Sequence, residues 1–514
     1  MAKVHHREFT ELPVTVDRSS DIPLPEQIVA SLREAIDHGT LRPGEPVPAT
    51  RELAARLRVA RGVVVAAYQQ LIAEGYLSAG HGRGTRVHPD LRELRSSTLD
   101  GALGPDARGI DSTQQPGPDG DSNSHATLDP RTPGPLAPGL PDTSAVATAA
   151  WKAAWRQAVA LDGVEAPDLG DPRLRGQLTE HLRRMRGTTR PVDDVLVTAG
   201  AREGLALLLS ALGSFRGGTL TVGVEDPGYP SLRRVASRQG AQILALPVDA
   251  EGLMTHVLPE TGLDAVIVTP SHQYPLGGSL PLSRRRELLE WAHRTGAVII
   301  EDDYDSELRH TGSPLPTLAA LDDRIDGAVS LLGTFSKTVS PALSAGFLLL
   351  PENLRRIVEP ARHDLGGPVS AVVQAALANY LESGELRRHT ARMRRRYASR
   401  RELVVERLLG VRGARVRPMS GGLHAVIEFR PGSAEAERRV FDACAGLGVV
   451  PLSAYWHGET GGGDRFGLVI GTGGSLGDDQ FDAALHALRR VLTDQLGPER
   501  SSARSINASR STTA

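Results

Sequence analysis

A lysine placed directly after an apolar run is the residue of this sequence best suited to covalent chemistry. Lys337 ends the motif GTFSK, which follows the apolar run of residues 328–332. Lysine is normally solvated, so a lysine at the end of a buried strand is unusual. Desolvation lowers the pKa of its amine and favours a Schiff base with an aldehyde cofactor. Taken alone, the motif is equally compatible with an ordinary loop lysine.

A second apolar run ends in carboxylates and a phenol, with the letters IIEDDY at residues 299–304. A pyridinium nitrogen needs a carboxylate partner to stay protonated and to act as an electron sink. Asp302 is the first candidate for this partner, and Asp303 is the second. Tyr304 can form a hydrogen bond with the ring oxygen of the cofactor. The alternative interpretation is an acidic surface turn.

A glycine-containing turn, TAGAR, joins a further strand to a helix and can hold a phosphate group. Backbone N–H groups at a helix N-terminus bind anions. The candidates in the turn are Gly200, Ala201 and Arg202. Thr334 and Ser336 of the lysine motif can add hydroxyl donors to the same phosphate.

Two more strand ends carry rings that can lie against a cofactor. Tyr229, in EDPGYP, can stack on the cofactor ring or pack beside it. His272, in TPSHQYPLG, can flank the ring, although a lone loop histidine is more often solvated.

These motifs follow apolar runs that alternate with helical patterns. The seven runs cover residues 194–198, 219–224, 242–247, 265–269, 297–300, 328–332 and 346–350. Continuous apolar strands separated by helices predict a mainly parallel sheet covered on both faces. Ligands of such sheets bind beyond the carboxyl ends of the strands, where all of these motifs stand.

The N-terminal part has a different pattern, which predicts a winged helix-turn-helix. A first helix carries apolar residues at helical spacing and ends near Gly39. A second, short helix is expected to be capped by Thr50. After a tight turn at residues 58–60, a recognition helix spans residues 61–74, with Val64, Tyr68 and Leu71 on its buried face. A hairpin with a basic tip follows at residues 80–87.

DNA contact is assigned to arginines of the turn and the wing, because the module as a whole carries no excess of basic residues. Arg61 stands at the start of the recognition helix, where side chains reach bases or phosphates. The expected DNA-binding residues are Arg51, Arg58, Arg61, Arg83 and Arg86. The alternative is a small protein-interaction domain with solvated arginines.

Composition divides the chain into a DNA-binding domain at residues 20–90, a disordered linker at 91–138, a third region at 139–495 and a disordered tail at 496–514. The linker is rich in Pro, Gly, Asp and Ser and has almost no bulky apolar residues. Within the third region, a smaller subdomain is expected over residues 352–495. The arginine-rich run 387–401 is read as a solvated helix face.

The bulk numbers exclude several classes of protein. A single cysteine, Cys444, excludes a disulfide framework and fits a reducing cytoplasm; this thiol is expected to be buried and inert. The N-terminus lacks the apolar core of a signal peptide, and no apolar stretch is long enough to span a membrane. With a net charge of −2, any DNA contact must come from a local patch.

Residues 48–87 resemble the DNA-binding domain of GntR-type regulators. The motifs TAGA, EDPGYP, TPSHQYPLG, EDDYDSELR and GTFSK, in this order, resemble fold-type I pyridoxal-phosphate enzymes of the aminotransferase class I/II. Their combination resembles the MocR-type subgroup of GntR regulators. The resemblance implies an α/β aminotransferase fold with a large mainly parallel sheet domain and a smaller α+β domain. It also implies pyridoxal 5'-phosphate, a head-to-tail homodimer and DNA-binding domains that move when an effector binds.

The sequence departs from this family at two arginines. Ser344 stands where family members have an arginine that holds the cofactor phosphate, so we expect weaker retention of the cofactor unless Arg202 compensates. No arginine occurs in the late strand of residues 466–471 that matches the substrate-carboxylate clamp; Arg465, just before it, is the substitute candidate. Without a clamp we expect transamination to be weak or absent.

The leading hypothesis is therefore a pyridoxal-phosphate-dependent transcriptional regulator that binds double-stranded DNA. Its effector is expected to be an amine, an amino acid or vitamin B6 itself. A second hypothesis is an active aminotransferase with an accessory DNA-binding module. A third is a regulator whose aminotransferase-like domain no longer binds cofactor and only dimerises. No metal is expected at the site.

Overall fold

The computed structural model describes most of the chain but not all of it. The described residues are 14–18, 23–37, 40–42, 44–73, 76–80, 84–87, 134–161, 167–310, 316–419, 421–457 and 465–496. The predicted linker, apart from its last five residues, and the predicted tail from residue 497 lie outside them.

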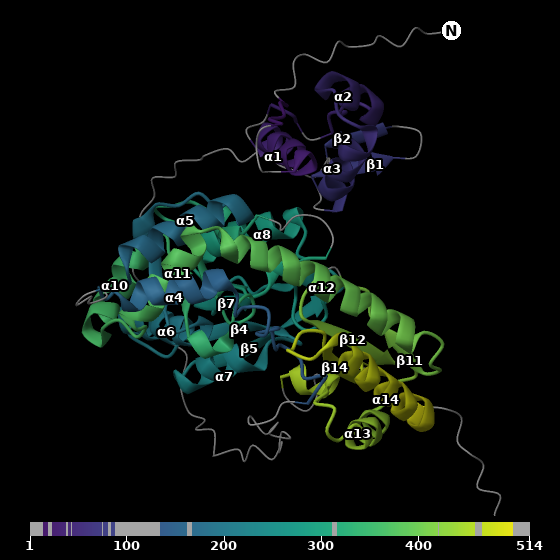
Figure 1. The fold of residues 1–514 in the computed structure, drawn as a ribbon. Helices are drawn as coiled ribbons and strands as arrows, with labels where there is room; N and C mark the ends of the chain where they lie inside the picture. Colours follow the sequence, from purple (N-terminus) through teal and green to yellow (C-terminus); the bar gives the residue numbers. More distant parts are fainter. Residues whose placement is uncertain are drawn as a thin grey trace, which may run out of the picture.

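The N-terminal module has the predicted order of three helices and a hairpin (Figure 1). Its elements are α1 (Leu24–Asp37), α2 (Thr50–Leu57), α3 (Arg61–Ala73), β1 (Leu77–Gly80) and β2 (Gly84–Val87), with the two strands antiparallel. Val64, Tyr68 and Leu71 of α3 are buried as predicted. Thr50 is not the cap, because Ala49 occupies that position and its side chain has no oxygen to offer.

An eight-stranded sheet forms the centre of the second domain. Its strands are β3 (Val195–Thr198), β4 (Thr221–Asp226), β5 (Gln242–Asp249), β6 (Gly252–Leu253), β7 (Ala265–Val268), β8 (Val298–Asp303), β9 (Val329–Thr334) and β10 (Gly346–Leu349). Their order is β3-β10-β9-β8-β7-β4-β5-β6. The seven predicted strands are all present. The sheet is mainly parallel, while β10 and β6 run antiparallel to their neighbours.

Helices cover both faces of this sheet. Successive strand residues point to opposite sides, so a continuous apolar strand has apolar side chains to bury on each face. Val266 and Ile299 pack in a core with helices of one face, and Ile267 and Ile300 pack in a core with helices of the other. The first face is covered by α4 (Ala149–Val159), α5 (Pro172–Arg186), α8 (Leu282–Thr295), α9 (Leu318–Leu321) and α11 (Ala371–Glu382). The second is covered by α6 (Ala201–Arg216), α7 (Pro230–Arg238) and α10 (Glu352–Leu365).

The smaller domain is an antiparallel sheet with helices on it. The sheet has the order β11-β12-β14-β13, and the long helix α12 connects it to the large domain (Figure 1). Its elements are α12 (Glu385–Leu408), β11 (Ala414–Val416), β12 (His424–Phe429), α13 (Ala434–Ala443), β13 (Val450–Pro451), β14 (Gly467–Gly471) and α14 (Asp478–Leu496). Cys444 is buried here, and burial raises the pKa of its thiol to about 11.

Two predicted boundaries need correction. The smaller domain does not start at residue 352, because Leu354 and Val358 of α10 belong to the core of the large domain. The predicted linker ends early, because Leu136 is fully buried in the core of the smaller domain. The segment around Leu136 is rich in Pro and Gly, so its composition did not indicate that this leucine is buried.

The arginines of residues 387–401 are only partly solvated. Arg388 and Arg395 are exposed, but Arg400 is buried, stacks on Phe481 and donates hydrogen bonds to backbone carbonyls. The face of α12 that packs against the smaller domain therefore uses arginine as a structural residue.

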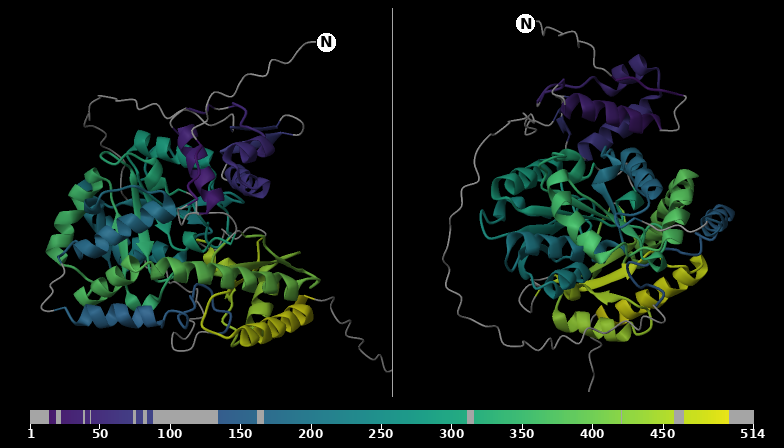
Figure 2. Two further views of the ribbon diagram at one scale, coloured as in Figure 1. Left: turned by 45° about the horizontal axis from the view of Figure 1, so that its top comes forward. Right: turned by 90° about the vertical axis from the view of Figure 1, so that its left-hand side faces the viewer.

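The winged module contacts the large domain next to α8. Leu282, the first residue of α8, is buried in the same apolar cluster as the core of the module. Figure 2 shows the module, in purple, against the large domain in both views. No helix within the described residues is both long and apolar enough to cross a membrane.

Candidate functional site

The candidate site lies at the carboxyl edge of the large sheet. Lys337 follows β9, and its half-buried side chain enters a small cavity. Nζ of Lys337 donates a hydrogen bond to the carbonyl oxygen of Gly139, at 2.6 Å. The cavity has a volume of about 80 Å³ and is also lined by Tyr229, Tyr304 and His424. The sequence-predicted lysine and two of the predicted rings are thus brought together.

The two candidate carboxylates at the end of β8 have different environments. Asp302 is buried, and its Oδ1 atom has no hydrogen-bond partner in the described structure. Burial raises the pKa of Asp302 to about 8, and the charges of Asp303 and Asp305 act in the same direction. Asp303 instead faces the buried guanidinium of Arg186, 3.3 Å away. Asp302 is therefore the carboxylate left without a cationic partner at hydrogen-bonding distance.

Glu225, at the end of β4, is a second buried carboxyl group beside Asp302, and the sequence analysis missed it. Both residues line one small cavity together with Tyr229. The Glu225 carboxylate accepts hydrogen bonds from the hydroxyl of Thr269 and from Nε2 of Gln273. Burial raises its pKa to about 7. Its sequence signal was its position directly after the apolar run of residues 219–224, at the start of the motif EDPGYP.

The predicted phosphate turn and the lysine motif lie side by side. Gly200, with φ at +88°, directly precedes α6. Its neighbour Gly346 is so close that an added Cβ would lie 2.9 Å from the Cα atom of Gly200. The hydroxyl of Thr334 donates to that of Ser336 at 3.0 Å, on the strand paired with Gly346. Backbone N–H groups and two hydroxyls therefore face one region.

Charged groups are scarce around this turn. Arg202 lies in the first turn of α6 and is exposed; Ala201, between it and Gly200, is half-buried. Ser344 is exposed and adopts the left-handed conformation, with φ at +43°. Extending the β9–β10 register places Ser344 opposite Ser336. Ser344, at the position where the family has an arginine, is therefore next to the loop that carries the hydroxyls of Thr334 and Ser336. The serine side chain is much shorter than an arginine side chain and cannot replace its reach toward a phosphate.

Tyr304 is held by a chain of hydrogen bonds. Its hydroxyl donates to the carbonyl oxygen of His272 at 2.9 Å and lies 3.1 Å from Nδ1 of the same residue. That nitrogen is 3.1 Å from both carboxylate oxygens of Asp305. The two rings are stacked at an interplanar angle of 21°. His272 is buried rather than solvated, which corrects the simplest expectation for a loop histidine.

Tyr274 and His424, which the sequence analysis did not single out, complete the aromatic lining of the cavity. Tyr274 contacts Tyr229, Tyr304, His424 and Tyr455 edge-on or tilted, at centroid distances of 4.7 to 5.7 Å. These five rings come from five separate segments, so no local pattern could have grouped them. Nε2 of His424 donates to the carbonyl oxygen of Pro275, and burial lowers the pKa of this histidine to about 3.

His272, Asp305 and His424 have potential ligand atoms within 4.8 Å of one another. Their hydrogen bonds within the protein already account for this arrangement. We therefore describe these residues as a hydrogen-bonding cluster and assign no metal to them.

Arg465 does not reach the cavity. In the β12–β14 register, Gly471 lies opposite His424, whereas the start of β14 lies opposite Glu428. Arg465 precedes that start and is exposed, about 20 Å along the strand from Gly471 at ~3.4 Å per residue. The prediction of Arg465 as a carboxylate clamp was therefore wrong, because it did not consider the direction of the strand.

The predicted DNA-binding arginines surround the turn of the winged module. Arg51, Arg58 and Arg61 are exposed, and Arg58 forms the tight turn with φ at +53°. Arg86 is also exposed and donates to the carbonyl oxygen of Gly44 at 3.2 Å. Arg83 lies outside the described residues.

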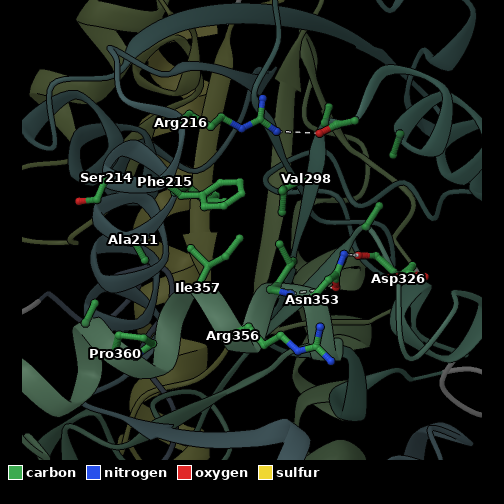
Figure 3. Close-up of a pocket in the computed structure, with 18 of the residues that line it drawn as sticks. Ala211, Ser214, Phe215, Arg216, Val298, Asp326, Asn353, Arg356, Ile357 and Pro360 are labelled. Carbon is green, nitrogen blue, oxygen red and sulfur yellow. Dashed lines mark hydrogen bonds between the residues drawn. The ribbon is translucent and has the colours of Figure 1, made fainter. Parts of the chain in front are cut away.

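A much larger cavity lies at the opposite edge of the sheet. It has a volume of about 890 Å³ and is lined by the C-terminal end of α6, by α10 and by the residues that begin β8. Figure 3 shows Phe215, Ile357 and Val298 pointing into it. Arg216 at its rim is already bound to Asp264. None of the predicted cofactor residues lines this cavity.

Comparison with known proteins identifies both domains. The family described as "Bacterial regulatory proteins, gntR family" matches residues 24–87. The family "Aminotransferase class I and II" matches residues 138–451. The HTH-type pyridoxine biosynthesis transcriptional regulator PdxR of Corynebacterium glutamicum is 42% identical over 466 residues, which cover 90% of this chain and 95% of that protein.

Two further relatives are regulators. The probable rhizopine catabolism regulatory protein MocR of Rhizobium meliloti is 32% identical and covers 76% of this chain and 78% of its own. The HTH-type transcriptional regulator TauR of Rhodobacter capsulatus is 33% identical, and the match covers 74% of this chain and 79% of TauR.

Among solved structures, an archaeal alanine:glyoxylate aminotransferase has a TM-score of 0.63 at 20% identity, covering 71% of this chain and 91% of its own. Kynurenine aminotransferase of Pyrococcus horikoshii has a TM-score of 0.61 at 23% identity, with 70% and 91% covered. At these identities the similarity establishes the aminotransferase fold.

Proposed function

The chain belongs to the MocR-type subgroup of GntR-family transcriptional regulators, and we propose that its aminotransferase-type domain binds pyridoxal 5'-phosphate through Lys337. Its function is transcriptional regulation, and its N-terminal domain is a DNA-binding domain. The fold of the second domain is that of the pyridoxal-phosphate-dependent aminotransferases. The binding of this cofactor by this chain, and the roles given to its residues below, are proposals.

The observation that carries the proposal is that Lys337 and Asp302 stand at the ends of the neighbouring strands β9 and β8, close enough for the charge of the lysine to act on the buried carboxyl group. A buried carboxyl group without a partner is costly. A protonated pyridine nitrogen would supply the missing charge and donate to the free Oδ1 atom. Asp303 is a poorer candidate, because Arg186 already faces it.

The remaining residues would position the ring and the phosphate. Tyr229 would pack against the ring, and Tyr304, steadied by His272, would bind the ring oxygen. The N-terminus of α6 at Gly200 and Ala201 would bind the phosphate, helped by the hydroxyls of Thr334 and Ser336. Arg202 is the nearest candidate for a phosphate cation on that turn. An aldehyde cofactor bound there supplies covalent attachment to the lysine amine.

The lining of the cavity favours vitamin B6 as the effector. Besides Lys337, the side chains that line the cavity are aromatic or apolar, apart from Asp305 and the neutral His424. An α-carboxylate would find no guanidinium there, whereas the aromatic lining suits a pyridine ring. The relative from Corynebacterium glutamicum, named for pyridoxine biosynthesis, points the same way.

A catalytically active aminotransferase is the weaker alternative. Substrate orientation supplies much of the rate of such enzymes, and neither Ser344 nor Arg465 provides the usual arginine contact. A head-to-tail homodimer remains part of the proposal and would give a mass of twice 54.8 kDa by light scattering.

Visible absorption of the purified protein tests cofactor binding. Pyridoxal 5'-phosphate joined to a lysine absorbs visible light, so wild-type protein should show a band that Lys337→Ala lacks. Asp302→Asn should weaken cofactor binding at least tenfold. Asp303→Asn is the matched control and should retain the band. A band that persists in Lys337→Ala would overturn the assignment of the lysine.

A further inference from the structure

Residues 134–142 form an extended strap that runs from the smaller domain to the lysine. Leu136 donates from its N–H to the carbonyl oxygen of Leu447 and accepts from the N–H of Gly471, at 2.8 and 2.7 Å. Its side chain is fully buried in the core of the smaller domain. The first half of the strap is thereby fixed to that domain.

The strap lies directly on the backbone of the turn after β14. A Cβ added to Gly471 would lie 2.0 Å from the carbonyl oxygen of Ala137, and one added to Gly473 would lie 1.8 Å from that of Leu140. The N–H of Gly474 donates to the carbonyl oxygen of Leu140 at 2.8 Å. Only glycine permits this close approach.

The far end of the strap is fixed to the long helix α12. The buried carboxylate of Asp142 is paired with Arg396, and its N–H donates to the hydroxyl of Tyr397 at 2.8 Å. Between these two anchors, the polar contact of the strap with the large domain is the bond from Nζ of Lys337 to Gly139.

The strap also closes the cavity. Pro138 and Gly139 form part of a wall around only about 80 Å³. Pockets for ligands of cofactor size start at roughly 300 Å³. A pyridine ring beside Lys337 therefore needs more room than this cavity has, and the strap is one part of the wall that would give way.

We propose that the hydrogen bond between Lys337 and Gly139 is a latch, and that covalent occupation of Lys337 releases the strap. The inference rests on the proposed function, because it takes an aldehyde as the reacting ligand. When the lysine amine reacts, a C=N bond forms and the aldehyde oxygen leaves as water with two protons of the ammonium group. The nitrogen keeps at most one N–H, which now lies in the plane of the new double bond.

Release of the latch frees the end of the second domain that is connected in sequence to the DNA-binding module. Residue 134 directly follows the segment 91–133 that joins the strap to the winged module. A carbonyl at Gly139 that loses its partner must find another or become solvated. The position of the strap, and with it the attachment point of the DNA-binding module, thus depends on whether Lys337 is free.

Hydrogen exchange of the cofactor-free full-length protein tests the latch without involving the cofactor. Lys337→Met removes the donor at nearly constant length, and Lys337→Arg keeps a cationic donor that cannot react with an aldehyde. We expect amides of residues 136–142 to exchange about tenfold faster in Lys337→Met than in wild type. They should be unchanged in Lys337→Arg. Helix α13 of the same domain is the internal control. Equal exchange of the strap in wild type and Lys337→Met would overturn the latch.

A second arm separates the latch from the proposed function. Adding pyridoxal 5'-phosphate should accelerate exchange of the strap in wild type and leave Lys337→Arg unchanged. Absence of the visible band in wild type would contradict cofactor binding, while the comparison of the cofactor-free variants would still decide on the latch. A visible band without a change in strap exchange would contradict the latch alone.

Discussion

The unpaired carboxyl group of Asp302 predicts that a polar substitution stabilises the cofactor-free protein. Burial raises the pKa of Asp302 from its ordinary 3.8 to about 8. At about 1.4 kcal/mol per pH unit, this difference costs the ionised folded state at most about 6 kcal/mol. Part of this cost comes from the neighbouring carboxyl groups of Glu225, Asp303 and Asp305, which can themselves take up a proton. We therefore expect Asp302→Asn to raise the free energy of unfolding by about 2–3 kcal/mol.

The sign of the effect depends on pH. Between pH 4 and pH 8 the folded chain holds a proton on Asp302 that the unfolded chain has released. The stability contributed by this residue is therefore complete below pH 4 and declines as the pH rises toward 8. The advantage of Asp302→Asn should be close to zero at pH 4 and reach its full size above pH 8.

Thermal unfolding of the cofactor-free protein at several pH values measures this difference. The aminotransferase domain of Asp302→Asn should melt roughly 4–6 °C above wild type at pH 8.5 and together with it near pH 4. Asp303→Asn is the matched control and should be destabilised, because it leaves the buried Arg186 without its counter-charge. A lower melting temperature of Asp302→Asn at pH 8.5 would refute the reasoning.

Three further predictions concern the other contacts. Arg61→Ala should weaken operator binding by about 1–3 kcal/mol if the guanidinium reads a base. If the guanidinium contacts a phosphate, the slope of log K against log salt in anisotropy titrations should fall by about 1. If both the affinity and the slope stay unchanged, Arg61 is not part of the DNA interface. Ser344→Arg should tighten pyridoxal 5'-phosphate binding roughly tenfold by absorbance titration, and an unchanged dissociation constant would contradict a phosphate site next to this residue. Leu136→Asp should loosen the strap and lower the melting temperature of the smaller domain, with the exposed Leu409→Asp as a neutral control.

The sequence predicted the sheet and located the proposed cofactor residues because both depend on local patterns. Apolar runs located all seven strands, and the motifs at their ends contained Lys337 and Asp302. It ranked Asp302 before Asp303, but it could not give the contact that separates them, because Arg186, which faces Asp303, comes from a distant helix.

The sequence predictions failed where the structure depends on contacts between segments that are distant in the sequence. The wall formed by Tyr274, His424 and Tyr455 joins separate segments. Arg465 was assigned by proximity in sequence, and the strand register places it at the wrong end of β14. The strap has a linker-like composition, and it is held by a few buried side chains, among them Leu136 and Asp142, and by close contact with glycines of the neighbouring turn.

The central claim is that occupation of Lys337 by pyridoxal 5'-phosphate controls DNA binding. Its most direct test is a fluorescence anisotropy titration of DNA from upstream of the gene for this protein, with and without the cofactor. The account predicts that the cofactor changes the dissociation constant of the wild type at least fivefold and leaves that of Lys337→Ala unchanged. The same dissociation constant with and without cofactor in the wild type, or an equal change in both proteins, would contradict it.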